Sequence, residues 1–190
     1  MRKTIKVDFS AKGFREAAKE LKKFKDELRQ LTRKFLDELM ERGISVSIAN
    51  AGEYSQFLVF TKELTDTPKG VLTIYRGSSP QIERQWVNSG GVQSYMVSPI
   101  MLAEFGSGWM ASDSRDGRNR QPNDYMARLA GMGQGTMPEQ IHAFDPMGWT
   151  WTDLNGVQHH SFGEKPTMPM YRAYLEMIDA VDSVVREVFA

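Results

Sequence analysis

The chain has 190 residues and a mass of 21.6 kDa, with 41% hydrophobic and 25% charged residues, which predicts one globular domain over residues 1–190 and excludes a wholly disordered chain. Lysine plus arginine and aspartate plus glutamate each number 24, and this balance argues against a dedicated nucleic-acid binder. The absence of cysteine excludes disulfides, thiolate zinc sites and cysteine nucleophiles, and neither a signal peptide nor a membrane-spanning segment is expected.

Charged side chains are distributed unevenly along the chain. Residues 1–42 carry 13 basic and 8 acidic side chains, whereas residues 43–190 carry 11 and 16. The two parts therefore have net charges of +5 and −5, which could attract each other within one molecule or between copies. A solvated helix face of mixed charge is the alternative interpretation.

The amino-terminal region predicts a short strand followed by a long helix. Apolar and polar residues alternate over Thr4–Phe9, as in a half-buried strand. Ser10 stands where an N-cap is expected, residues 14–42 contain neither proline nor glycine, and Gly43 is the expected C-cap. Apolar residues recur in this helix at a heptad-like spacing: Phe14, Ala17, Leu21, Phe24, Leu28, Leu31 and Phe35. A helix of about 30 residues is about 45 Å long, so part of it should project or pack on something outside the subunit.

The centre of the chain predicts β structure. Tyr54–Leu64 and Val71–Gly77 are rich in aromatic and β-branched residues and are separated by a turn. Gln81–Val87 is a candidate third strand. Tyr95–Phe105 is apolar and fits either a strand or a short helix that begins at Pro99.

An irregular segment and a hairpin follow. Residues 107–147 show no sustained period and include the run Gly131-Met132-Gly133-Gln134-Gly135, which predicts a long flexible loop or insertion. Residues 148–152 and 157–162 then flank Asn155-Gly156. Asn-Gly between two alternating segments is a strong signal for a β-hairpin.

The carboxyl-terminal segment predicts a second amphipathic helix over Met170–Phe189. Its apolar residues also recur at alternating spacings of three and four: Tyr171, Tyr174, Ile178, Val181, Val185 and Val188. Two helices with such stripes around the predicted strands indicate an α+β fold, in which a long N-terminal and a C-terminal helix pack on a small mixed or antiparallel sheet. Leu28 and Ile178 are then expected in the core.

Histidines are the main candidates for metal or catalytic chemistry. The chain has three of them, His142, His159 and His160, and they allow the hypothesis of a metal-dependent nuclease or hydrolase. Adjacent residues of a strand point to opposite faces, so His159 and His160 are poorly placed to share one ion. The glycine-rich strings lack the lysine of a phosphate-binding loop. The interpretation favoured by the sequence is a protein without enzymatic activity, metal or cofactor.

Tryptophans offer a second candidate chemistry. Trp149 and Trp151 lie on the same face of one predicted strand, and stacking on single-stranded bases would make the protein a monomeric nucleic-acid-binding module. No basic groove is interleaved with these residues in the sequence. A core position or a subunit interface is therefore the favoured interpretation.

Three motifs occur in order after the first helix. An apolar segment ends in Leu102-Ala103-Glu104-Phe105-Gly106-Ser107-Gly108, an aromatic hairpin contains Gly148-Trp149-Thr150-Trp151 and Asn155-Gly156, and Pro166-Thr167-Met168-Pro169-Met170-Tyr171-Arg172-Ala173 opens the last helix. This order resembles the tail-completion, or neck, proteins of long-tailed bacteriophages, a family of minor tail components. The resemblance covers residues 1–42 and 95–190, and Ser107 stands where that family has threonine.

The resemblance implies a structural virion protein that has no turnover. Such proteins form homo-oligomeric rings at the head–tail junction, between a connector or head-completion protein and a tail terminator or tail-tube protein. DNA passes through the ring without sequence-specific binding, no membrane is involved, and the protein is located in the virion and, during assembly, in the host cytoplasm. The expected contact residues are Glu104, Phe105, Gly106, Trp109, Trp149, Trp151, Met168 and Tyr171. Gly106 is also expected to adopt a positive φ.

Overall fold

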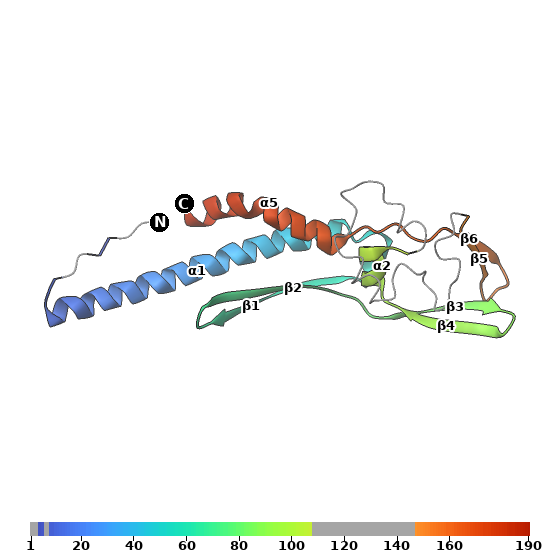
Figure 1. Ribbon diagram of the computed structural model, residues 1–190, viewed down its shortest axis with the longest axis horizontal. Coiled ribbons are helices and arrows are strands. Elements are labelled where there is room, and N and C mark those ends of the chain that lie inside the picture. The colour runs from blue at the N-terminus through green and yellow to red at the C-terminus, as the bar shows by residue number, and fades with distance from the viewer. Residues whose placement is uncertain (1–3, 6–7, 108–146) are drawn as a thin grey trace.

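The structure is a computed structural model, which describes residues 4–5, 8–107 and 147–190. Its elements in chain order are α1 (Ala11–Ala49), the 3-10 helix η1 (Gly52–Phe57), β1 (Val59–Thr67), β2 (Gly70–Ser78), β3 (Ile82–Asn88), β4 (Gly91–Val97), α2 (Pro99–Phe105), β5 (Trp149–Thr152), β6 (Gln158–Ser161) and α5 (Pro169–Phe189). The molecule is elongated, with α1 and α5 at one end and β3 to β6 at the other (Figure 1). The fold is α+β, as the sequence predicted.

Helix α1 begins where the sequence predicted and is longer than predicted at its carboxyl end. Ser10 is its N-cap, as expected, because its Oγ accepts a hydrogen bond from the Gly13 amide at 3.0 Å. The strand predicted for Thr4–Phe9 is wrong for the described residues of that range, which have no strand structure. The helix also runs past Gly43 and ends at Asn50, whose backbone and side-chain amides donate to the Val46 carbonyl.

Gly43 has a packing role in place of the predicted capping role. A Cβ atom at this position would lie 2.8 Å from the Met177 sulfur of α5. The missing side chain therefore lets the two helices approach closely. This contact is a long-range one, which explains why the sequence alone suggested a helix end.

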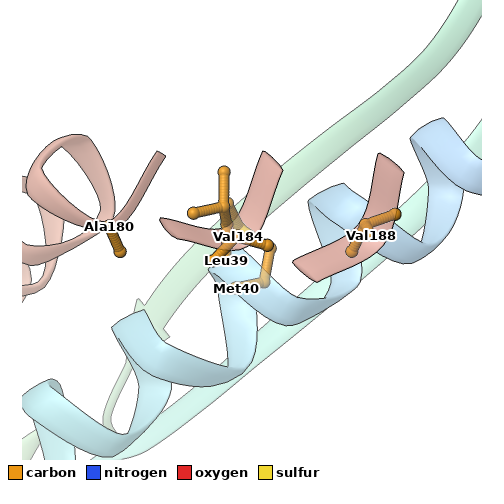
Figure 2. Packing of buried hydrophobic residues seen from close by; sticks show 5 residues of the cluster. All are labelled: Leu39, Met40, Ala180, Val184 and Val188. Atoms are coloured by element: carbon orange, nitrogen blue, oxygen red, sulfur yellow. The ribbon is translucent and has the colours of Figure 1, made fainter. Parts of the chain in front are cut away.

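The main hydrophobic core lies between α1 and α5, which run antiparallel. Its buried residues are Leu39 and Met40 from α1 with Ala180, Val184 and Val188 from α5 (Figure 2). Leu31, Phe35, Tyr75, Met177 and Phe189 pack against this cluster. The Phe35 and Phe189 rings lie 6.1 Å apart, so the end of α5 lies beside the middle of α1.

The face that α5 buries differs from the predicted one. Its buried residues include Ala173, Ala180, Val184 and Val188, whereas most of the predicted apolar stripe is exposed to solvent. Ile178, expected in the core, is 49% exposed. The prediction failed because α5 carries apolar residues around more than half of its circumference, and the small alanines that allow close approach to α1 were not counted as core.

Three of the seven residues of the predicted α1 stripe are exposed as well. Leu31 and Phe35 pack against the core, but α1 continues beyond the end of α5 (Figure 1). On this extension Phe14 is 55%, Leu21 57% and Leu28 41% exposed. Leu28 is therefore not a core residue, contrary to expectation.

The strands form two separate antiparallel sheets, where one sheet was expected. Strands β1 and β2 form a hairpin with a turn at residues 68–69, and α1 lies between this hairpin and α5 (Figure 1). Lys62 of β1 forms ion pairs with Asp37 and Glu41 of α1, each with an N–O distance of 2.5 Å. At the tip of the hairpin, Arg33 pairs with Asp66 at 3.2 Å.

The second sheet has the strand order β4-β3-β5-β6. The predicted hairpin is confirmed as β5 and β6, with Gly156 at a φ of +79° in its turn. Tyr95–Phe105 contains both structures that the sequence allowed, since β4 ends at Val97 and α2 begins at Pro99. The strand predicted from Tyr54 is wrong for its first four residues, which belong to η1 and bury the Tyr54 ring in a second cluster with Val97, Leu102 and Ala103.

One matched pair of substitutions tests the position of the core. Val184→Asp should lower the free energy of unfolding by about 3 kcal/mol or more, because Val184 is fully buried in an apolar cluster where a carboxylate would lose its hydration. Ile178→Asp should cost about 1 kcal/mol or less in the monomer, since half of that side chain is already exposed. Urea denaturation at concentrations where the protein is monomeric measures both. Equal losses for the two variants would contradict the packing of α5 described above.

Candidate functional site

Two of the sequence motifs meet where α2 ends and α5 begins. We call this region the junction and define it as residues 103–107 together with residues 164–171. Its central contact is a carboxylate at a helix N-terminus: Glu104 Oε2 accepts from the Met170 amide at 2.9 Å and Oε1 from the Tyr171 amide at 3.0 Å. These amides lack partners within α5 because they belong to its first turn. A negative charge there is also favoured by the helix dipole.

Met168 is the N-cap residue of α5 and adopts the left-handed conformation, with φ of 53° and ψ of 51°. It makes no side-chain cap to the helix, so the side-chain acceptor for the first turn comes from Glu104. The Thr167 and Met168 amides both donate to the Ala103 carbonyl at 2.9 Å, and the Met168 side chain is 1% exposed. The chain entering α5 is therefore fixed to the end of α2.

Gly106 adopts a φ of +66°, which confirms the expected positive value. A Cβ at Gly106 would lie 2.4 Å from the Glu164 carbonyl oxygen, so only glycine fits both the conformation and the space. The next residue, Ser107, exchanges two backbone hydrogen bonds of 2.9 Å with Glu164. This bridge joins the residue after α2 to the segment that leads into α5.

A half-buried carboxyl group lies next to this bridge. The Tyr54 hydroxyl donates a hydrogen bond to Glu164 Oε2, which ties η1 to the junction. Burial raises the pKa of Glu164 above its ordinary value, and the charge of Glu53 adds to this rise, whereas Tyr54 and Arg84 act in the opposite direction. Burial together with Glu164 also raises the pKa of Tyr54, so the tyrosine stays protonated and serves as a donor.

The hairpin places His159 in a network of its own. The imidazole stacks on Trp151, with ring centroids 4.4 Å apart, and its Nε2 lies 3.0 Å from Asp153 Oδ2. Asp153 Oδ1 accepts from the Asn155 and Val157 amides of the turn, each at 2.9 Å. The hydrogen bond from His159, followed by these backbone bonds, lowers the pKa of Asp153. These contacts stabilise the hairpin turn.

The three histidines do not converge in the part of the chain that the structure describes. His160 lies on the other face of β6, with its Nδ1 3.3 Å from Thr150 Oγ1 and its ring against Phe162. His142 lies outside the described residues. Within residues 4–5, 8–107 and 147–190, no group of three or more histidine or carboxylate side chains is arranged to hold a metal ion.

Five of the eight predicted contact residues are at the junction: Glu104, Phe105, Gly106, Met168 and Tyr171. Trp149 and Trp151 lie in β5 and are half-buried, and Trp109 lies outside the described residues. The contacts seen at Glu104, Gly106 and Met168 are all within the subunit. Their role between subunits stays a prediction.

Two apolar surfaces are exposed where the sequence predicted core residues, although the length of the first helix also predicted that part of it projects from the subunit. The first, which we call the α1 arm, is the face of residues 11–30 that carries Phe14, Leu21 and Leu28. The second, which we call the outer α5 face, consists of Tyr174, Leu175, Ile178, Val181 and Val185, each between 37% and 55% exposed. The heptad-like spacings were a signal for both, but they were interpreted as core.

Comparison of the chain with protein-family models, with curated proteins and with solved structures finds no match. Among the described residues, no helix combines the length and the apolar character needed to cross a membrane. Functional inference therefore depends on the geometry and on the motif order.

Glu104→Ala tests the capping contact. Loss of both acceptor oxygens in Glu104→Ala should lower the free energy of unfolding by about 1–2 kcal/mol. Glu104→Gln should lower it by less, because glutamine keeps one acceptor oxygen without the charge. Glu176→Ala removes an exposed carboxylate from α5, the helix that Glu104 caps, and should change the free energy of unfolding by about 0.5 kcal/mol or less. Chemical denaturation at neutral pH is the measurement. A loss for Glu104→Ala no larger than for Glu176→Ala would show that the cap contributes nothing.

Proposed function

We propose that this protein is a structural subunit of the head–tail junction of a long-tailed bacteriophage, which completes the tail and joins it to the head. In this role it assembles into a homo-oligomeric ring around the DNA channel, between a connector or head-completion protein and a tail terminator or tail-tube protein. It acts without turnover and without a cofactor. Its location is the virion, and the host cytoplasm during assembly.

The observation that carries the proposal is the extent of exposed apolar surface on two helices. The α1 arm and the outer α5 face present large apolar side chains that are between 37% and 57% exposed. Surfaces of this kind mark sites of protein–protein contact. A subunit that functions only together with neighbours would have such surfaces, whereas an enzyme of this size that acts as a monomer would not need them.

The junction gives the motif order a structural meaning. In the resemblance, the Glu104-Phe105-Gly106 string and the Met168-Pro169-Met170-Tyr171 run are separate motifs. In the structure, Glu104 caps the helix that the second motif opens, and Gly106 fits against Glu164 just before it. Because the two motifs contact each other, they support the proposal as one combined sequence signature.

The two alternative functions receive less support from the geometry. For a metal-dependent nuclease or hydrolase, His159 is engaged by Asp153 and Trp151, and His160 faces the other way. For a nucleic-acid-binding module, one face of Trp151 is already stacked on His159. Neither alternative accounts for the exposed apolar faces of α1 and α5.

Deletion of the gene from a phage that encodes it tests the proposed function. The mutant should produce filled heads and separate tails that fail to join, or tails of abnormal form, and the gene supplied in trans should restore infectious particles. Electron microscopy and plaque counts measure the outcome, and the purified protein should show a particle mass of several subunits. Normal infectious particles from the deletion mutant would overturn the proposal.

A further inference from the structure

The α1 arm continues a face that α5 already covers elsewhere. Leu31 and Phe35 pack against the core that α5 forms. Phe14, Leu21 and Leu28 precede them on the same face at intervals of seven residues, which is about two helical turns. The arm therefore presents the same kind of surface as the part of α1 that binds a helix. About 20 residues of helix extend for about 30 Å.

The outer α5 face resembles the arm in its heptad-like spacing. Helix α5 has 21 residues, which correspond to about 32 Å. Tyr174, Ile178, Val181 and Val185 recur at intervals of four, three and four residues, which is the pattern by which one helix packs along another. Both surfaces are thus apolar stripes along helices: Phe14 to Leu28 extends for about 21 Å and Tyr174 to Val185 for about 17 Å.

Charge distinguishes the possible pairings. Residues 11–30 carry seven basic and four acidic side chains, whereas α5 carries two basic and four acidic ones. Contact between two arms, or between two α5 helices, would bring net charges of the same sign together. Contact between an arm and an α5 helix would bring opposite charges together.

Two exposed side chains illustrate this complementarity. Lys25 lies four residues after Leu21 and three before Leu28, and Asp182 has the same relation to Ile178 and Val185. Each charge therefore lies beside its own apolar stripe. An arm seated on an outer α5 face places these charges along the edge of the shared contact.

The arm does not reach the outer α5 face of its own chain. Gly43 is in contact with Met177, and Leu21 lies 22 residues before Gly43 on the same helix, about 33 Å away along the axis. Any contact between Leu21 and Ile178 is therefore a contact between two molecules.

We infer that the α1 arm of one copy packs on the outer α5 face of the next copy. The contact joins two different surfaces, so every subunit offers one of each, and repetition closes a ring when the rotation between subunits allows it. The inference deepens the proposed function, on which it rests, by naming the contact between neighbouring ring subunits.

Cysteine cross-linking tests this contact, because the chain contains no cysteine of its own. Leu21→Cys and Ile178→Cys chains that carry different affinity tags are oxidised separately and as a mixture. The mixture should give a covalent dimer that contains both tags, whereas each variant alone should stay uncross-linked. The double variant Leu21→Cys/Ile178→Cys should give a ladder of covalent multimers. Circular dichroism should first show that each variant is folded.

A control pair uses the polar faces of the same helices. Lys19→Cys and Glu176→Cys, both at exposed positions, should give no mixed dimer. Covalent dimers of either single variant alone would indicate pairing between identical surfaces, and would overturn the inference while leaving a ring possible. Mixed cross-links no more frequent than those of the control would also overturn it. A particle mass of one subunit at all concentrations would overturn both the inference and the proposed ring.

Charge reversal provides an independent readout. Lys25→Glu and Asp182→Lys should each weaken association about tenfold or more, and a chain with both changes should recover most of that loss because opposite charges again face each other. Sedimentation as a function of protein concentration measures the association. Additive losses in the double variant would contradict the contact between these two surfaces.

Discussion

Antiparallel packing of α5 on the second half of α1 determines which surfaces of this molecule are buried. The contact is made by small and branched residues such as Ala180 and Val184 against Leu39 and Met40 (Figure 2). Because α5 approaches α1 with this face, its other apolar face is turned to solvent. Because α5 ends beside Phe35, the first half of α1 continues beyond α5, and Phe14, Leu21 and Leu28 are exposed there. Both exposed surfaces follow from this one helix pair.

The position of α5 along α1 is fixed at its first turn from two sides. Ser47, which is fully buried near the end of α1, donates its hydroxyl hydrogen bond to the Pro169 carbonyl at 2.8 Å and is also bonded to the Tyr75 hydroxyl. From the other side, Glu104 accepts the first amides of α5. A buried polar group with its partners in place tolerates little displacement. The junction thus sets the register of the helix pair and, with it, the location of the exposed faces.

Local signals in the sequence were sufficient to predict secondary-structure elements but not to predict how these elements pack. The Ser10 cap, the Asn155-Gly156 turn and the two amphipathic helices depend on neighbouring residues, and all were predicted. The buried face of α5 was not, because a heptad-like stripe looks the same whether it meets the core or solvent. The sequence predicts a helix end at Gly43 because local patterns carry no information about its contact with Met177.

In the candidate site, too, the sequence predicts the features that depend on neighbouring residues but not those that depend on distant ones. Gly106 could be assigned a positive φ from its residue type and position, and the structure confirms it. The pairing of Glu104 with the start of α5 spans more than 60 residues, and no spacing rule predicts it. In the sequence, only the order of the motifs associated Glu104 with the residues at the start of α5. The exposed apolar faces required knowledge of where α5 ends on α1.

Hydrogen exchange along α1 tests most directly whether one helix serves both its own subunit and a neighbour. In dilute monomer, amides of residues 31–49 should exchange slowly because α5 and β1–β2 cover that half, while those of residues 11–30 should exchange quickly. On assembly at high concentration, residues 11–30 should become protected as well. Equal protection of both halves in the monomer, or an arm that stays unprotected in the assembled particle, would contradict this account.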